Sequence, residues 1–283
     1  MRMPLGSMFL RWGMCGMFFC FCITWVQAQR ALSNAHVPWV NGEVLIYDVK
    51  WGLVKAAEAL FKAEDLGDRW KFSLNLKTVG LVDAFYPVNS RFVSITEKGY
   101  WRSMGYFEDR NENRRVRRTS STVDYWKKVG VFLNQTTGEK RMFRFKHEIL
   151  HDLGSVLYGT RLADWERAGK RRVCVYERGK IKNGWIYFEK RVVESVAGWP
   201  KQRLWCLYGE PEPDSDGKVR GNVRMWLTDD KRRIPLYARV KFRWGTFEIE
   251  LKEAFPYGLV NYERNLGASQ IKARATASAT KRP

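Results

Sequence analysis

Alternation of apolar and polar residues with a period of two recurs along the chain from Val44 onward. Successive side chains of a strand point to opposite faces, so this period is typical of half-buried strands and not of helices. The run EVLIYDVKW at residues 43–51 and the run WKFSLNLKTV at residues 70–79 show it clearly, and turns containing Gly or Asp separate such runs. The pattern predicts a mainly β protein made of antiparallel hairpins.

About fourteen segments follow this pattern: residues 43–51, 55–63, 70–79, 91–97, 100–108, 121–129, 130–134, 140–145, 172–177, 185–196, 203–208, 222–228, 235–243 and 246–252. Strongly twisted sheets of more than about 10 strands curl or split. We therefore expect one strongly curled antiparallel sheet, or an incomplete β-barrel.

Two segments interrupt the strand pattern with helical features. Residues 80–86 form one or two turns that end at Pro87, since proline disfavours helix in the residue before it. A second helix begins near Asp152, a good N-cap, and places Leu153, Val156, Leu157 and Leu162 on one stripe. We expect this short helix to pack across the sheet or to fill its open end.

The first 28 residues have the composition of a secretory signal peptide. Arg2 and Arg11 precede an uncharged run at residues 14–26, and Val26 and Ala28 suit the two positions that a signal peptidase reads. A membrane anchor would need about 20 apolar residues, more than this run offers. We expect cleavage after Ala28, a single β-rich envelope domain over residues 29–267, and a disordered basic tail over residues 268–283. The predicted location is periplasmic or secreted.

Two cysteines, Cys174 and Cys206, remain after the predicted cleavage. An oxidising compartment permits a disulfide between them, but two buried, inert thiols fit the sequence equally well, and the strand pattern does not decide. A cysteine zinc site is excluded because the chain contains no CxxC motif and no Cys/His cluster.

Positive charge restricts the class of partner. The chain has 50 Lys and Arg against 30 Asp and Glu, a net charge of +20, so a partner attracted over a distance is anionic. The densest cluster comprises Arg114, Arg115, Arg117 and Arg118. We expect it to form a solvated loop that contacts anionic envelope material such as lipid headgroups or polysaccharide. Export argues against nucleic acid as the partner.

Four motifs occur in a recognisable order: YDVKWG at residues 47–52, GLVDAFYPV at residues 80–88, DxxSxLYxxR at residues 152–161, and WLTDDxRRIP at residues 226–235. Together they resemble the bacterial envelope family catalogued as domain of unknown function 3108, from about Pro38 to Lys252. The resemblance implies an exported, β-rich protein of Gram-negative bacteria with no assigned reaction.

Several motif residues are candidates for ligand binding if they line a cavity: Trp51, Tyr86, Asp152, Tyr158, Arg161, Trp226, Asp230 and Arg233. Turn chemistry explains the Trp-Gly and Asp-Asp pairs equally well. Arg161 and Tyr158 could equally take part in a buried ion pair with Asp83 or Asp230.

An HExxH motif at His147, Glu148 and His151 raises the alternative of a zinc metalloprotease. On a helix the two His share one face, and the Glu can act as general base for a metal-bound water. However, the N-cap signal at Asp152 lies after both His, and no third ligand stands at a suitable spacing. We therefore expect neither a metal site nor catalytic residues here.

The sequence favours a non-enzymatic envelope protein without a cofactor. A curled sheet tends to leave an apolar concavity, which suits binding or shuttling of an amphipathic or anionic envelope component. The alternatives are the HExxH metalloprotease and a structural or assembly factor of the envelope that docks on a membrane or a protein. Peripheral membrane contact is compatible with the sequence, and the oligomeric state is left open.

Overall fold

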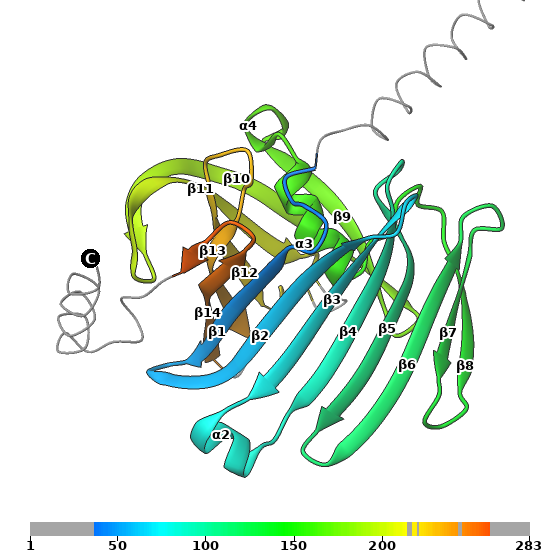
Figure 1. Ribbon diagram of the computed structural model, residues 1–283. Coiled ribbons are helices and arrows are strands. Elements are labelled where there is room, and N and C mark those ends of the chain that lie inside the picture. Colours follow the sequence, from blue (N-terminus) through cyan, green and yellow to red (C-terminus); the bar gives the residue numbers. More distant parts are fainter. Residues whose placement is uncertain (1–36, 214–216, 220, 243–244, 261–283) are drawn as a thin grey trace, which may run out of the picture.

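A computed structural model describes residues 37–213, 217–219, 221–242 and 245–260 (Figure 1). The predicted signal peptide and basic tail lie outside these residues. The strands are β1 (Val44–Trp51), β2 (Val54–Asp65), β3 (Arg69–Thr78), β4 (Asn89–Glu97), β5 (Arg102–Glu112), β6 (Arg115–Asp124), β7 (Val129–Asn134), β8 (Lys140–Arg144), β9 (Lys170–Glu177), β10 (Lys180–Val196), β11 (Trp199–Pro211), β12 (Asn222–Thr228), β13 (Pro235–Phe242), β14 (Gly245–Phe255) and β15 (Leu259–Val260).

These strands form a single antiparallel sheet in the order β8-β7-β6-β5-β4-β3-β2-β1-β14-β13-β12-β11-β10-β9, with β15 paired to β14. Neighbours in the sheet are neighbours along the chain except β1 and β14, whose pairing joins the two halves. The sheet is strongly curled and is not closed by hydrogen bonds between β8 and β9. The predicted fold class is therefore confirmed.

Each of the predicted strand segments overlaps one of strands β1 to β14, but the region of β6 required correction. The arginine cluster is not a solvated loop: Arg114 lies in the β5–β6 turn, and Arg115, Arg117 and Arg118 belong to β6. Arginines on both faces of the strand conceal its alternation. The predicted strand 121–129 is wrong at its end, because β6 stops at Asp124 and a turn leads into β7.

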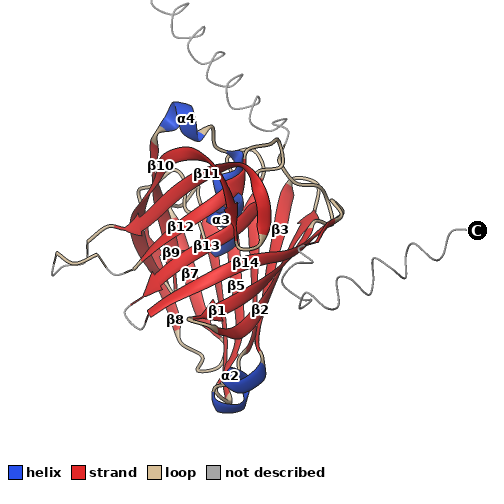
Figure 2. Cartoon of the chain, turned by 90° about the vertical axis from the view of Figure 1, so that its left-hand side faces the viewer, coloured by secondary structure: helices blue, strands red, loops and turns tan. Residues whose placement is uncertain are grey.

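Three short helices accompany the described sheet: α2 (Gly80–Phe85), α3 (Leu153–Leu162) and α4 (Trp165–Ala168). The first two match the predicted helices, whereas α4 is too short to give a periodic signal. The Asp152 carboxylate accepts the Ser155 amide, and the Ser155 hydroxyl accepts the Asp152 amide, which forms a capping box. Figures 1 and 2 show α3 lying across one end of the curled sheet. No helix of the described chain is long and apolar enough to cross a membrane.

The two ends of the sheet overlap through side chains. Ile186 of β10 faces the rolled interior, because it packs on the cluster that also takes in Leu157 of α3. Ile186 pairs with Arg171, which lies five residues before Tyr176 on β9, so Tyr176 points to the outer face of its own strand. Nevertheless, Tyr176 packs with Phe92 and Tyr106 on the inner face of β4 and β5. The β9 edge therefore lies inside the opposite end of the sheet, as in a scroll.

Aromatic side chains fill the rolled interior under α3. Tyr158 of α3 stacks on Phe72 with ring centroids 3.9 Å apart, and Trp39 and Trp70 complete the cluster. The two best-formed hollows of the described chain each offer about 10 Å³, room for about one water. Pockets for small molecules usually measure about 300–1,000 Å³. Under α3, the apolar concavity expected from the curled sheet is therefore occupied by the protein's own side chains.

Candidate functional site

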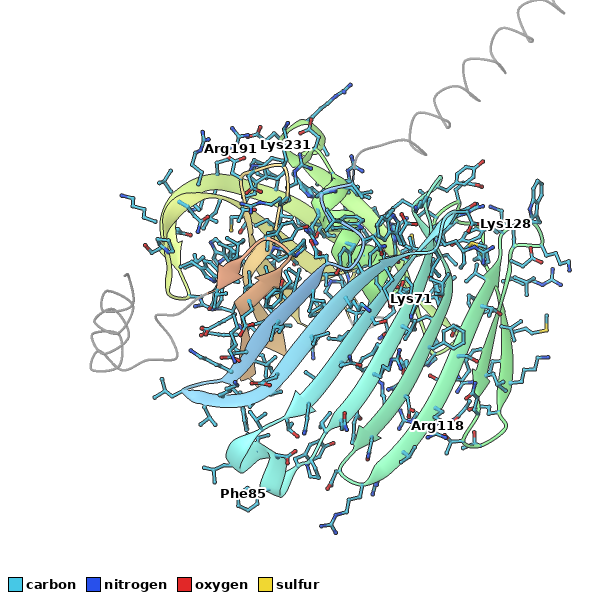
Figure 3. All side chains as sticks on the ribbon, in the orientation of Figure 1. Lys71, Phe85, Arg118, Lys128, Arg191 and Lys231 are labelled. Carbon is cyan, nitrogen blue, oxygen red and sulfur yellow. The ribbon has the colours of Figure 1, made fainter. Side chains whose placement is uncertain are left out.

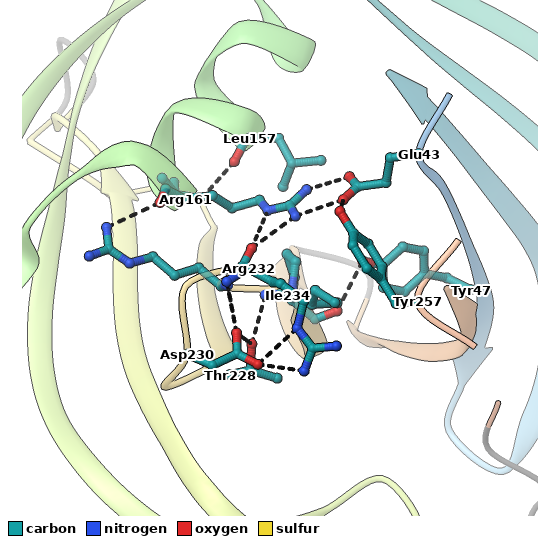
Figure 4. A network of polar contacts seen from close by, with 12 residues as sticks. Glu43, Tyr47, Leu157, Arg161, Thr228, Asp230, Arg232, Ile234 and Tyr257 are labelled. Atoms are coloured by element: carbon teal, nitrogen blue, oxygen red, sulfur yellow. Dashed lines mark hydrogen bonds and ion pairs between the residues drawn. The ribbon is translucent and has the colours of Figure 1, made fainter. Parts of the chain in front are cut away.

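A buried ion pair anchors α3 in the rolled sheet (Figure 4). Arg161 Nη1 lies 2.5 Å from Glu43 Oε1 and Nη2 lies 2.9 Å from Oε2, and both side chains are at most 1% exposed. The Tyr257 hydroxyl donates to the same carboxylate at 2.6 Å. Burial alone lowers the pKa of Arg161, but hydrogen bonds and charge from Glu43 outweigh it, so this pKa is raised. Arg161 is in a buried ion pair, but its partner is Glu43 and not Asp83 or Asp230.

The turn between β12 and β13 holds the end of α3. Arg161 donates to the Arg232 carbonyl at 2.9 Å, and Arg233 Nη1 donates to the carbonyls of Arg161 and Ala163 at 3.1 and 2.5 Å. Asp230 accepts the Thr228 hydroxyl and the Arg232 amide, both at 2.9 Å, and thereby shapes the turn. Asp230 and Arg233 thus act on the backbone and the helix end, and line no ligand-sized pocket.

Asp152 is a second buried anchor of α3. Its carboxylate accepts hydrogen bonds from the Ser155 amide and the Ser103 hydroxyl, and Ser103 also contacts the Tyr176 hydroxyl at 2.7 Å. Burial raises the pKa of Asp152, although the hydrogen bonds lower it in part. Trp226 lies elsewhere: it packs on Tyr237 and donates to Glu194 at 2.7 Å.

The HExxH motif is not helical. His147, Glu148 and His151 all precede α3, so the i, i+4 spacing does not place the two imidazoles on one helix face. Glu148 pairs with Lys128 at 2.9 Å, and His147 Nδ1 lies 3.3 Å from Cys174 Sγ. Among the described residues no group of three His, Cys, Asp or Glu is placed to hold a metal ion. The local backbone thus gives no support to the metalloprotease alternative.

The two cysteines do not form a disulfide in this structure. Strand β10 separates them, with Cys174 opposite Asn183 and Cys206 opposite Lys190, seven residues further along. Burial raises the pKa of Cys206 to about 12, so its thiol is unreactive near neutral pH. Of the two alternatives left open by the sequence, the structure has the free thiols.

Two motif residues, Trp51 and Tyr86, lie at the opposite end of the scroll from α3. We call this the loop end; it comprises the β1–β2 turn, the α2 connection, the β5–β6 turn and the neighbouring ends of β13 and β14. The Val79 amide donates a hydrogen bond to the Ala56 carbonyl at 3.0 Å, which links the α2 connection to β2. The Asn113 amide donates to the Pro87 carbonyl at 2.7 Å, which links the β5–β6 turn to the α2 connection. Figure 1 shows the β1–β2 turn, α2 and the β5–β6 turn along the lower edge of the sheet.

The loop end exposes large apolar side chains. Leu53 is fully exposed, Phe85 is 82% exposed and Leu81 72% exposed, and α2 contains no buried residue. Trp51, Val54, Tyr86 and Phe242 are also exposed. Figure 3 shows Phe85 projecting away from the body of the molecule. Single exposed apolar residues are ordinary, but a group on adjoining connections indicates an interaction surface.

The same end carries cations without acidic partners. The exposed residues Arg91, Arg114, Arg115 and Arg117 make no ion pair within the described chain. Two nearby acids are paired with other cations, Asp109 with Arg118 and Glu112 with Arg110, each at 3.3 Å, whereas Asp83 accepts a hydrogen bond from the Thr78 hydroxyl at 2.7 Å. The loop end therefore combines apolar side chains with unneutralised positive charge. The sequence provided its arginines, Trp51 and Tyr86, but not Leu53, Leu81 and Phe85, because nothing local marks an apolar turn residue as exposed.

Comparison with known proteins places the chain by family and fold. The family model described as "Protein of unknown function (DUF3108)" matches residues 46–252. A search of curated proteins found no match. The crystal structure of a β-barrel-like protein of domain of unknown function DUF1849 from Brucella abortus is similar, with a TM-score of 0.55 and 8% identity. That match covers 76% of this chain and 98% of the other, and at this identity it shows the fold alone.

Proposed function

The chain belongs to the DUF3108 family, and from this premise we propose that it is an exported, non-catalytic envelope protein that binds an anionic, amphipathic component at its loop end. The observation that carries the proposal is the joint presence there of exposed apolar side chains and cations without acidic partners. An amphipathic anion satisfies both, because it offers apolar surface to the former and negative charge to the latter.

The filled interior supports binding on the outside of the roll. Asp152, Tyr158 and Arg161 are buried and engaged with protein groups, so a ligand could reach them only by displacing α3. The best-formed hollows are too small for an alkyl chain. A carrier that encloses its cargo is thus a poorer fit to this geometry than a protein that docks through an exposed surface.

Titration with a soluble amphiphile tests the proposal. Calorimetry with monomeric dodecyl phosphate should give saturable binding, whereas zwitterionic dodecylphosphocholine should bind at least about 10-fold more weakly if two cations contribute. The double substitution Arg115→Gln and Arg117→Gln should weaken dodecyl phosphate binding. Arg118→Gln is the matched control, because Arg118 is already paired with Asp109. Equal binding of both amphiphiles, or an equal loss in the control, would contradict the proposed anionic preference.

Export requires its own experiment. The uncharged run before Ala28 motivates the prediction that the mature chain starts at Gln29 in the envelope fraction. N-terminal sequencing of the fractionated protein measures this directly. A full-length chain in the cytoplasm would refute the export part of the proposal and leave the binding part to be judged by the titration.

A further inference from the structure

We infer that the partner of the loop end is the surface of an anionic phospholipid bilayer, into which the β1–β2 turn and α2 insert side chains. The inference rests on the proposed function and specifies its partner. It starts from shape: the apolar residues of the loop end are exposed, and the two best-formed hollows of the described chain lie under α3 and offer about 10 Å³ each. A single alkyl chain covers protruding side chains only in part, whereas a bilayer receives them among its own acyl chains.

Two apolar points form the proposed contact. Leu53 stands at the tip of a tight turn in which Gly52 has φ of 59°, and Trp51 beside it stacks on Phe247 of β14 at 6.2 Å. Leu81 and Phe85 are four residues apart in α2, so they lie on one face of that helix. The hydrogen bond from the Val79 amide to the Ala56 carbonyl holds α2 against β2, and so keeps the β1–β2 turn and α2 near each other.

Positive charge adjoins these points on the next hairpin. The Asn113 amide donates a hydrogen bond to the carbonyl of Pro87, which lies two residues after the end of α2. Arg114 and Arg115 come directly after Asn113 where β5 turns into β6, so they lie beside the apolar helix. Guanidinium groups form paired hydrogen bonds with phosphate oxygens, which suits them to phospholipid headgroups. Near an anionic membrane each such cation strengthens binding about fivefold.

The opposite end of the scroll arranges its apolar side chains and charges differently. It too exposes apolar residues, with Trp126 at 97% and Leu66 at 51%. Several of its cations are paired, namely Lys98 with Asp65, Arg102 with Glu97, Lys127 with Asp124 and Lys128 with Glu148, whereas the exposed Lys146, Arg167 and Lys231 make no ion pair within the described chain. At the loop end, by contrast, unpaired arginines directly adjoin apolar tips on neighbouring connections, which is the combination that an anionic membrane surface attracts.

Co-sedimentation with vesicles tests the inference on the purified protein. Vesicles of phosphatidylcholine and phosphatidylglycerol at 3:1 should sediment the protein, and vesicles of phosphatidylcholine alone should not. Leu53→Asp and Phe85→Asp should each weaken partitioning at least about 10-fold, since each replaces an inserted apolar side chain by an anion that the surface repels. Arg115→Gln with Arg117→Gln should weaken it about 25-fold, and Arg118→Gln by less than about twofold.

Matched controls separate membrane contact from general stickiness. Leu66→Asp and Trp126→Asp remove exposed apolar side chains from the other end and should leave partitioning unchanged. All substituted side chains are exposed, so the circular dichroism spectrum and melting temperature should stay those of the parent protein. If Trp126→Asp abolished binding while Leu53→Asp and Phe85→Asp did not, the loop end would not be the membrane contact.

The outcomes also separate this inference from the proposed function. Saturable binding of dodecyl phosphate without sedimentation on anionic vesicles would overturn the bilayer as partner and keep the amphiphile site. Absence of both would overturn the two together. Sedimentation that depends on Leu53 and Phe85 but not on the vesicle charge would support insertion and contradict the role assigned to the arginines.

Discussion

At the scale of the residue, Arg161 depends on groups that are distant in the chain. Its carboxylate partner, Glu43, lies 118 residues away, and Tyr257 shares that carboxylate. A local motif therefore marks Arg161 as notable but cannot identify its partner. Asp83 and Asp230 were chemically reasonable, but Asp83 binds Thr78 and Asp230 shapes the turn before β13.

Removing the guanidinium should destabilise the fold strongly. Arg161→Met leaves Glu43 buried without its counter-ion, a change that typically costs about 3–5 kcal/mol. Urea denaturation should show this loss in the free energy of unfolding. The double variant with Glu43→Gln should lose less than the sum of the two single variants, because neither charge then remains buried alone. Additive losses would show that the two side chains do not interact.

His151 should make the protein sensitive to acid. Burial lowers its pKa to about 4, below the ordinary value of about 6.5, so between these values the unfolded chain binds more protons. Its contribution to stability is complete above about pH 6.5 and falls as the pH drops toward 4, by about 2 kcal/mol between pH 7 and 4.5.

The variant His151→Leu isolates this effect. The raised pKa of Asp152 acts in the opposite sense as the pH falls, so the informative quantity is the difference between the parent protein and the variant. Urea unfolding at pH 7 and pH 4.5 should show a smaller acid-induced loss in His151→Leu. An identical loss in both proteins would mean that the buried imidazole is protonated in the folded state.

At the scale of the element, the strands were predictable because alternation and turn residues are local signals. The first half of β6 was not, since Arg115 and Arg117 on one face and Arg118 on the other mask the period of two. The start of α3 was predictable from the Asp152 cap, and that position also explains why HExxH is not helical. The site was only partly predictable: the arginines are visible in the sequence, whereas exposure of Leu53 and Phe85 depends on how the connections lie.

Gly154 tests the packing of α3 on the sheet. A Cβ on Gly154 would lie 2.6 Å from the Cβ of Ser94, so Gly154→Ala must push the helix away from β4. Overpacking of this kind costs about 1–3 kcal/mol, which exceeds the gain of about 1 kcal/mol from alanine in a helix. Thermal unfolding should therefore show a lower melting temperature. The control Gly99→Ala meets no atom within 4 Å and should leave it unchanged. A higher melting temperature for Gly154→Ala would mean that α3 packs less tightly on β4 than this distance indicates.

At the scale of the whole molecule, the overlap of the sheet ends decides what the fold can do. Periodicity predicts a curled sheet, but not that Tyr176 of β9 packs against Phe92 and Tyr106 from the other half. This overlap, together with α3, fills the interior and directs binding to the ends of the scroll. At the loop end the unpaired arginines adjoin the apolar tips, and this arrangement predicts an orientation: the axis of the scroll points toward the membrane with α3 on the far side.

Hydrogen exchange on vesicles would measure that orientation. With phosphatidylglycerol vesicles present, backbone amides in residues 51–54 and 81–86 should exchange more slowly, because insertion removes them from water. Amides in residues 125–128, which include the exposed Trp126 of the opposite end, should exchange at the same rate with and without vesicles. The Leu53→Asp variant should lose the protection in both loop-end segments, since the two apolar points enter the same surface. Protection confined to residues 125–128 would reverse the orientation, and protection spread over both ends would indicate adsorption without a preferred face.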